Sequence, residues 1–121
     1  MQNSMEILCK IRNIYHAIGN IERQLQEAHG ICLNEGSLLA CLDTHGKCTA
    51  GQIAQILDLS ASNTSKIIAS MEKKGLVGRL RGDSDKRRMF FSLTPAGLDL
   101  LKSLSGQTEQ AKQVLQEIKE L

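Results

Sequence analysis

Residues 61–97, ASNTSKIIASMEKKGLVGRLRGDSDKRRMFFSLTPAG, decide the fold of this 121-residue chain. In the helix that opens this stretch, the side chains within one arc must face the core, and they are Thr64, Ile67, Ile68 and Met71. After Gly75 the apolar period becomes that of strands, so residues 77–81 and 88–93 indicate a hairpin with GDSDK at its tip. Residues 94–95, Thr-Pro, have the types of an N-cap and a first helical residue. The stretch therefore predicts a helix, a two-stranded hairpin and a second helix.

The segment before this stretch predicts three more elements. Residues 5–28 carry apolar side chains at alternating spacings of four and three, which indicates one long helix. Asn34 is expected to be the N-cap of a helix that runs to about Leu42. Thr49, with Gln52 three residues later, has the pattern of a capping box at the start of a third helix.

The predicted order is helix, helix, turn, helix, two-stranded hairpin and helix, which is that of a winged helix-turn-helix. The fold class is therefore mainly α, with a two-stranded wing as its small β part. We expect a single domain over residues 1–121, with the winged helix-turn-helix at residues 34–93. Residues 1–30 and 95–121 are then expected to be dimerisation helices.

Length and composition bound the class of protein. A chain of 121 residues fits one domain, and abundant Leu, Ile, Gln, Glu and Lys beside only three aromatic residues favour helix. No apolar run approaches the roughly 20 residues that span a bilayer, and the N-terminus lacks the pattern of a secretory signal. We expect a soluble, cytoplasmic protein with no membrane partner.

The net charge of +2 conceals a basic segment at residues 66–88. This segment holds eight lysines or arginines and three acids, a net +5, whereas the rest holds seven bases and ten acids, a net −3. A basic patch on a mildly acidic body is typical of a surface that binds a polyanion. A solvated charged loop is the alternative.

The arc opposite the core side of the 61–74 helix carries small polar side chains. Solvent-facing helices usually carry Glu, Lys and Gln, whereas Ser and Asn lower helix propensity. Small side chains let the backbone approach another surface closely, as when a helix enters the major groove of DNA. The residues predicted to contact bases and nearby phosphates are Ser60, Ser62, Asn63, Ser65 and Lys66, with Lys73 at the margin. A helix that merely tolerates serine is the alternative.

The hairpin beside that helix is expected to reach the flanking phosphates or the minor groove. The cations predicted to serve this wing are Arg79, Arg81, Lys86, Arg87 and Arg88. Asp83 and Asp85 are predicted to hold wing arginines in fixed rotamers, so that less side-chain entropy is lost on binding. Their expected partners are Arg79, Arg81 or Arg87. Such pairs contribute about 0–1 kcal/mol each in water, so their expected value is orientation.

The same stretch resembles the signature of MarR-type bacterial transcription regulators. The matching residues are Lys74, Gly75, Leu76 and Val77 at a helix end, Asp85, Lys86 and Arg87 in the wing, and Leu93, Thr94 and Gly97 before the next helix. Three elements occur in order at the right spacing, and the resemblance covers about residues 35–105. It implies a homodimeric regulator, expected to be a repressor, that binds a pseudo-palindromic operator. It also implies control by a small-molecule effector or by oxidation.

Two apolar stripes favour pairing of two copies independently of the family. The residues predicted to form the dimer interface are Ile7, Ile11, Ile14, Ile18, Leu101, Leu104, Ala111, Leu115 and Ile118. A single small domain cannot easily cover both stripes, and burial of one stripe against a second copy is the simplest solution. Gly106 is expected to kink or split the C-terminal helix. Packing of the two stripes against each other within one chain is the alternative.

The sequence contains four cysteines, which are Cys9, Cys32, Cys41 and Cys48. They form no C-x-x-C motif, and a cytosolic chain should keep them reduced. A metal site would use Cys41, His45, Cys48 and Cys32. Because Cys41 also fits the apolar side of its helix as a small hydrophobe, we expect no metal. A redox switch centred on Cys9 or Cys48 is a second alternative.

Enzyme classes are not favoured, because the sequence has no Gly-rich phosphate loop, paired catalytic carboxylates or nucleophile motif. We therefore expect no enzyme and no cofactor. The predicted function is sequence-specific regulation of transcription, with double-stranded DNA as the partner. One alternative is a winged-helix interaction module whose basic wing binds an acidic protein, and another is a thiol- or metal-responsive variant of the regulator. Salt-dependent binding of a duplex separates the first alternative from the regulator.

Overall fold

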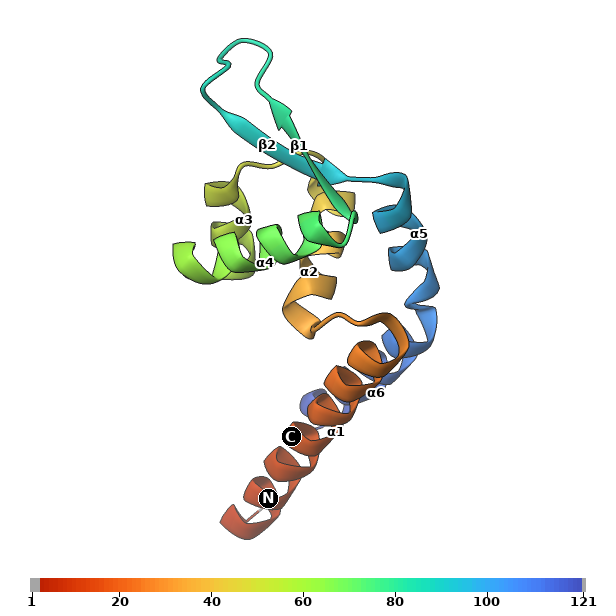
Figure 1. Cartoon of the computed structure of the whole chain (residues 1–121). Coiled ribbons are helices and arrows are strands. Elements are labelled where there is room, and N and C mark those ends of the chain that lie inside the picture. Colours follow the sequence, from red (N-terminus) through yellow and green to blue (C-terminus); the bar gives the residue numbers. More distant parts are fainter. Residues whose placement is uncertain (1–2, 121) are drawn as a thin grey trace. The chain divides into compact units, whose positions relative to one another are not determined.

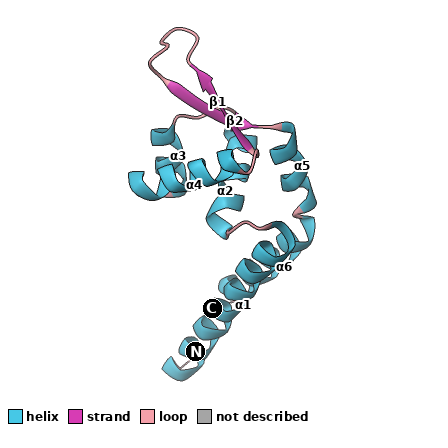
Figure 2. Cartoon of the chain, in the orientation of Figure 1, coloured by secondary structure: helices cyan, strands magenta, loops and turns pink. Residues whose placement is uncertain are grey.

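The computed structural model describes residues 3–120, apart from the side chains of residues 105–108 (Figure 1). Its elements are α1 (Ser4–His29), α2 (Leu33–His45), α3 (Ala50–Leu57), α4 (Ala61–Lys73), β1 (Val77–Arg81), β2 (Met89–Leu93), α5 (Pro95–Ser103) and α6 (Ser105–Lys119). Helices dominate, and the two strands form the only sheet of the described residues (Figure 2). The chain divides into two compact units. One comprises Asn34–Ser103, and the other comprises the residues up to Leu33 together with those from Leu104.

The unit Asn34–Ser103 has the predicted winged helix-turn-helix order, with α5 added after the wing. Strands β1 and β2 are antiparallel, in a register from Val77 opposite Leu93 to Arg81 opposite Met89. The buried apolar side chains of this unit include Leu38, Leu39, Ile53, Ile68, Met71, Val77 and Phe91. The mainly α fold with a two-stranded wing is therefore confirmed.

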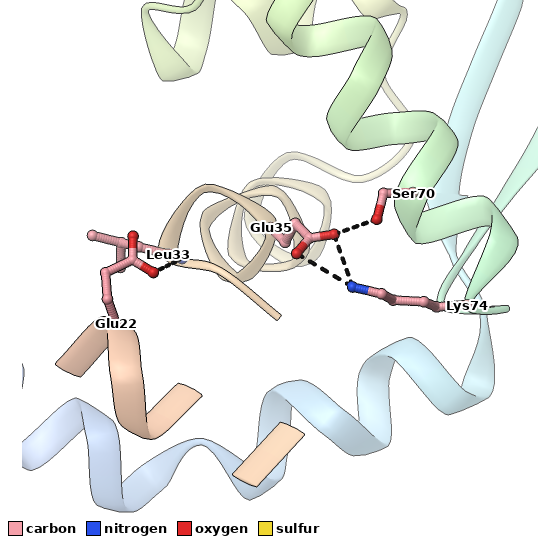
Figure 3. A network of polar contacts seen from close by, with 5 residues as sticks. All are labelled: Glu22, Leu33, Glu35, Ser70 and Lys74. Carbon is pink, nitrogen blue, oxygen red and sulfur yellow. Dashed lines mark hydrogen bonds and ion pairs between the residues drawn. The ribbon is translucent and has the colours of Figure 1, made fainter. Parts of the chain in front are cut away.

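Local capping signals explain most helix starts. The capping box of α3 is present, because Thr49 Oγ1 accepts from Gln52 N–H while Gln52 Oε1 accepts from Thr49 N–H. The start of α2 differs from the prediction that Asn34 is its N-cap, since the helix already begins at Leu33. A carboxylate from α1 supplies the missing acceptor, because Leu33 N–H donates to Glu22 Oε2 at 2.9 Å (Figure 3).

Two glycines, Gly75 and Gly97, lie where the start of α5 contacts the loop between α4 and β1. Gly75 lies in the left-handed region, with φ 76°, between α4 and β1. Thr94 Oγ1 donates to the carbonyl oxygen of Gly75 at 2.7 Å, and Thr94 N–H donates to that of Leu76 at 3.2 Å. A Cβ atom at Gly97 would overlap the Leu76 carbonyl oxygen, so only glycine fits where α5 approaches this loop.

In the other unit, α1 and α6 lie side by side (Figure 1). The buried side chains of these two helices include Ile14, Ile21, Leu25 and Val114. The C-terminal helix is split as expected, but the break falls at Leu104 and not at Gly106. As a result α5, expected among the dimerisation helices, belongs to the winged-helix unit. Within the described residues, no helix is long and apolar enough to cross a membrane.

Candidate nucleic-acid interface

Helix α4 presents the predicted polar face to solvent. Ser60 is its N-cap, and Ser60 Oγ accepts from Asn63 N–H at 3.1 Å. The opposite side is anchored in the core by Thr64 (1% exposed), Ile68 and Met71. The predicted contact residues, Ser60, Ser62, Asn63, Ser65, Lys66 and Lys73, are all exposed. The helix therefore offers a surface of small side chains and two cations, with the hydroxyl of Ser60 engaged in capping.

The C-terminal half of α4 is held to α2 by a polar network that the sequence did not indicate. Glu35 on α2 is only 7% exposed, and its carboxylate accepts from Ser70 Oγ at 2.6 Å. Lys74 Nζ donates to both carboxylate oxygens of Glu35, at 3.1 and 3.3 Å (Figure 3). Ser70 is half-buried and faces this carboxylate. Charge-assisted hydrogen bonds of this kind fix the placement of a helix more strongly than neutral ones.

The arginines of β1 have partners other than those predicted. Arg79 Nε and Nη2 donate to the two carboxylate oxygens of Glu72 on α4, at 2.6 and 3.0 Å. The hydrogen bonds and charge of Glu72 raise the pKa of Arg79. Arg81 Nη1 donates to the backbone oxygen of Lys86 at 3.1 Å. The prediction that the wing aspartates hold Arg79 or Arg81 is therefore wrong, because an acid on α4 and a backbone carbonyl lie closer.

The two aspartates of the hairpin tip behave differently from each other. Asp85 Oδ1 accepts from both the backbone N–H and Nε of Arg87, at 3.0 and 3.3 Å, so this predicted pair is present. Asp83 instead lies 3.8 Å from Lys47 Nζ, and its side chain is 97% exposed. Only Asp85 therefore restricts a wing arginine, and Asp83 faces a cation from outside the hairpin.

Lys47 is a basic residue at the wing that the sequence analysis missed. Its Nζ lies 5.0 Å from the ring centroid of Phe90, and the guanidinium carbon of Arg88 lies 5.1 Å from the same centroid. Both distances are in the range of cation–π contacts. Lys47 lies outside the basic segment 66–88, so no charge run marked it.

The four cysteines differ in burial. Cys41 and Cys48 are buried, Cys32 is half-buried and Cys9 is exposed. No group of three or more His, Cys, Asp or Glu side chains among the described residues could hold a metal ion. Burial, with a smaller contribution from Cys48, raises the pKa of Cys41 to about 11. The Cys41 thiol is therefore protonated at neutral pH and acts as a small hydrophobe.

The predicted dimerisation residues divide by exposure. Ile14 and Leu104 are buried, and Leu101 and Ala111 are half-buried. The exposed ones are Ile7, Ile11, Ile18, Leu115 and Ile118. Exposed apolar residues of α1 outside the predicted set are Met5, Leu8 and Tyr15. The alternative, packing of α1 on α6 within one chain, does occur. It leaves a large part of the apolar stripes of both helices exposed.

Helices α3 and α4 followed by an antiparallel hairpin define this chain as a winged helix-turn-helix protein. Residues 31–89 match the model of the MarR family. This part of the chain, just under half of it, is therefore similar to the MarR family, as the resemblance of its wing motifs had indicated.

Known proteins agree with this assignment. The HTH-type transcriptional regulator YwhA of Bacillus subtilis, itself uncharacterised, is 31% identical over 62 residues, or 51% of this chain and 45% of that protein. The match thus spans less than half of that relative. The S. aureus MepR–DNA complex has a TM-score of 0.77 at 24% identity, covering 100% of this chain and 86% of that one. Bordetella bronchiseptica BpsR has a TM-score of 0.75 at 19% identity, covering 93% and 78%. At these identities the two structures support the fold alone.

Proposed function

We propose that this chain binds a pseudo-palindromic DNA operator as a homodimer and represses transcription there. The observation that carries the proposal is that one compact unit presents a helix with a small polar face together with a cationic hairpin. The major groove admits an α-helix, and a wing beside that helix reaches the adjacent backbone or minor groove. The MepR–DNA complex, a structural neighbour, supports DNA as the ligand.

In this proposal α4 reads bases. Ser62, Asn63 and Ser65 are exposed, and none has a long side chain that would hold the backbone away from the groove. Asn63 has a carboxamide, which can pair with an adenine edge through two hydrogen bonds. Because its backbone N–H is already capped by Ser60, its side chain is not needed for the helix start. Lys66 and Lys73 lie on the same exposed arc, where they would contact phosphates.

The cations of the wing differ in how freely they could contact a DNA phosphate. Arg87 and Arg88 are exposed on the hairpin, and Asp85 restricts the rotamers of Arg87. Arg79 is bound to Glu72 through two hydrogen bonds, so it is the wing arginine least available to a phosphate. We infer that Lys86, Arg87 and Arg88 make the main wing contacts, with Arg81 beside them.

The dimer is proposed from the uncovered apolar residues of α1 and α6. Tyr15 is 75% exposed, Leu8 64% and Leu115 57%, which is a large exposure for side chains of this size on neighbouring helices. Burial against the same surface of a second copy gives an isologous interface with two-fold symmetry. Such a dimer matches a pseudo-palindromic operator, whose half-sites lie about one helical turn apart.

A small-molecule effector is part of the proposal. The structure of BpsR concerns the regulation of its DNA binding by 6-hydroxynicotinic acid, which is a property of that protein. In this chain a hollow of about 240 Å³ lies between α1 and α6, and its lining includes Asn20, Gln24 and Val114. Release of operator DNA on addition of small aromatic acids, with no release from the same duplex by acetate, would support an effector.

Duplex binding tests the proposal. The purified protein should select an operator from genomic fragments, and its affinity should fall steeply with salt, because each neutralised phosphate adds about 0.9 to the log–log slope. Arg87→Ala should cost about 1–3 kcal/mol of operator binding if Arg87 enters the minor groove. Asn63→Ala should change base preference and leave the slope unaltered. A folded protein that binds no duplex at low salt, yet captures an acidic protein, would support the interaction module instead.

A further inference from the structure

We propose that Lys47, Arg88 and Phe90 form a binding site for a backbone phosphate of DNA. In the free protein the carboxylate of Asp83 lies where this phosphate would bind. This inference rests on the proposed DNA-binding function, and it adds Lys47, which lies outside both the recognition helix and the basic segment 66–88. It also assigns to Asp83 a role opposite to that predicted from the sequence, namely competition with DNA.

The backbone explains why Lys47 and Phe90 meet although 43 residues separate them in sequence. Cys48 and Phe91 form an antiparallel bridge, in which the N–H of each donates to the carbonyl oxygen of the other at 3.0 and 2.8 Å. The side chains of both bridge residues are buried. Since side chains alternate between the two faces of a strand, Lys47 and Phe90 lie on the opposite face as diagonal neighbours.

Phe90 acts as a platform that holds two cations. Lys47 Nζ and the guanidinium carbon of Arg88 lie 5.0 and 5.1 Å from its ring centroid. Each cation–π contact at an exposed site is worth about 0.5–1 kcal/mol, which is enough to bias the rotamers of long side chains. A cation whose rotamers are already restricted in this way loses less side-chain entropy when it binds an anion.

Asp83 shows that an anion is drawn to this position. Its carboxylate lies 3.8 Å from Lys47 Nζ, although its side chain is 97% exposed. An ion pair this exposed contributes only about 0–1 kcal/mol, so a phosphate can displace the carboxylate at little cost. Duplex DNA carries one charge per roughly 1.7 Å of helix axis, a far denser anion than one aspartate.

The surface beside Lys47 leaves room for a backbone. A hollow of about 330 Å³ is lined by His45, Lys47, Cys48, Gln52, Gln55 and Ile56. Three of these residues, Gln52, Gln55 and Ile56, belong to α3, the first helix of the helix-turn-helix. In helix-turn-helix proteins this helix crosses the DNA backbone. The hollow therefore lies next to the element that general docking geometry brings to the phosphates.

The site can be tested by anisotropy titration of a fluorescent mixed-sequence duplex of about 30 base pairs at several salt concentrations. Lys47→Gln should lower the log–log salt slope by about 0.9, the loss of one phosphate contact. Lys102→Gln, which removes the same charge from an exposed position of α5, is the matched control and should leave the slope close to that of the wild type. Circular dichroism of each variant verifies folding.

The Asp83 variant distinguishes competition from orientation. Asp83→Asn should bind the duplex up to about fivefold more tightly at low salt, because the competing charge is gone. Asp99→Asn on α5 controls for the change in net charge. Equal slopes for wild type and Lys47→Gln, or weaker binding by Asp83→Asn than by Asp99→Asn, would overturn the site. Failure of the wild type to bind any duplex would instead overturn the proposed function.

Discussion

Replacement of Gly97 by alanine should destabilise the winged-helix unit, because it disturbs the junction of β2 and α5. A Cβ atom at this position overlaps the carbonyl oxygen of Leu76 and lies 3.1 Å from its carbonyl carbon and 3.3 Å from Leu93 Cδ2. The first of these neighbours is backbone, so no side chain can rotate away. Either α5 or the loop at Leu76 must move. That movement strains the hydrogen bond from Thr94 N–H to the Leu76 carbonyl oxygen, which measures 3.2 Å.

The expected cost combines two effects. Overpacking against a backbone that cannot yield costs about 1–3 kcal/mol, and the weakened hydrogen bond adds about 0.5–1.5 kcal/mol. A substitution of glycine by alanine also stabilises by about 0.4–1 kcal/mol through the unfolded chain. The net loss in the free energy of unfolding should therefore be about 0.5–4 kcal/mol.

Urea denaturation at one fixed protein concentration measures this loss, because unfolding of an oligomer depends on concentration. Gly19→Ala is the matched control, since nothing lies within 4 Å of a Cβ atom there and Gly19 lies inside α1. That control should gain about 0.5–1 kcal/mol from helix propensity. If Gly97→Ala were as stable as the wild type, the close approach of α5 to Leu76 would not exist in solution.

Three further predictions concern single contacts. Lys74→Met should lower the free energy of unfolding by about 1 kcal/mol or more beyond the effect of Glu35→Gln, because it removes the Lys74 ammonium from the carboxylate of Glu35, a residue that is only 7% exposed. Equal urea midpoints for the two variants would contradict this. Glu72→Gln should loosen Arg79 and raise the salt slope of DNA binding by up to about 0.9, as read by anisotropy; no change would mean that Arg79 reaches no phosphate. Leu115→Glu should shift sedimentation from dimer to monomer, because it places a charge on a side chain proposed to be buried between copies; an intact dimer would locate the interface elsewhere.

The features that the sequence predicted correctly depend on neighbours within one or two turns of chain. The capping box of Thr49 and Gln52 and the two-stranded hairpin after Gly75 both follow from residue types a few positions apart. Alternation of buried and exposed side chains has a period of its own in helices and strands, so the core side of α4 could be assigned from the sequence. The three wing motifs likewise occupy a short stretch, and residues 31–89 match the model of the family that they resemble.

Predictions failed where a partner from another element intervened. The expected N-cap at Asn34 is absent because Glu22 of α1 provides the acceptor one residue earlier. Ile53 and Ile56 are three positions apart in α3, which is the spacing of one helix face, yet Ile53 is 1% exposed and Ile56 is 43% exposed. Helical spacing places a side chain on a face, but it does not say how far the neighbouring helices extend over that face.

Locally encoded patterns alone determined that this chain forms a winged helix-turn-helix with a basic hairpin, since capping, period and turn residues act over a few positions. Only the tertiary structure decided which charges meet. It joined Glu35 to Lys74 across 39 positions and brought Lys47 to Phe90 through the bridge at Cys48. Such pairs depend on the relative placement of separate elements, which is set by packing of the whole core and leaves no mark in the spacing of residues along the chain.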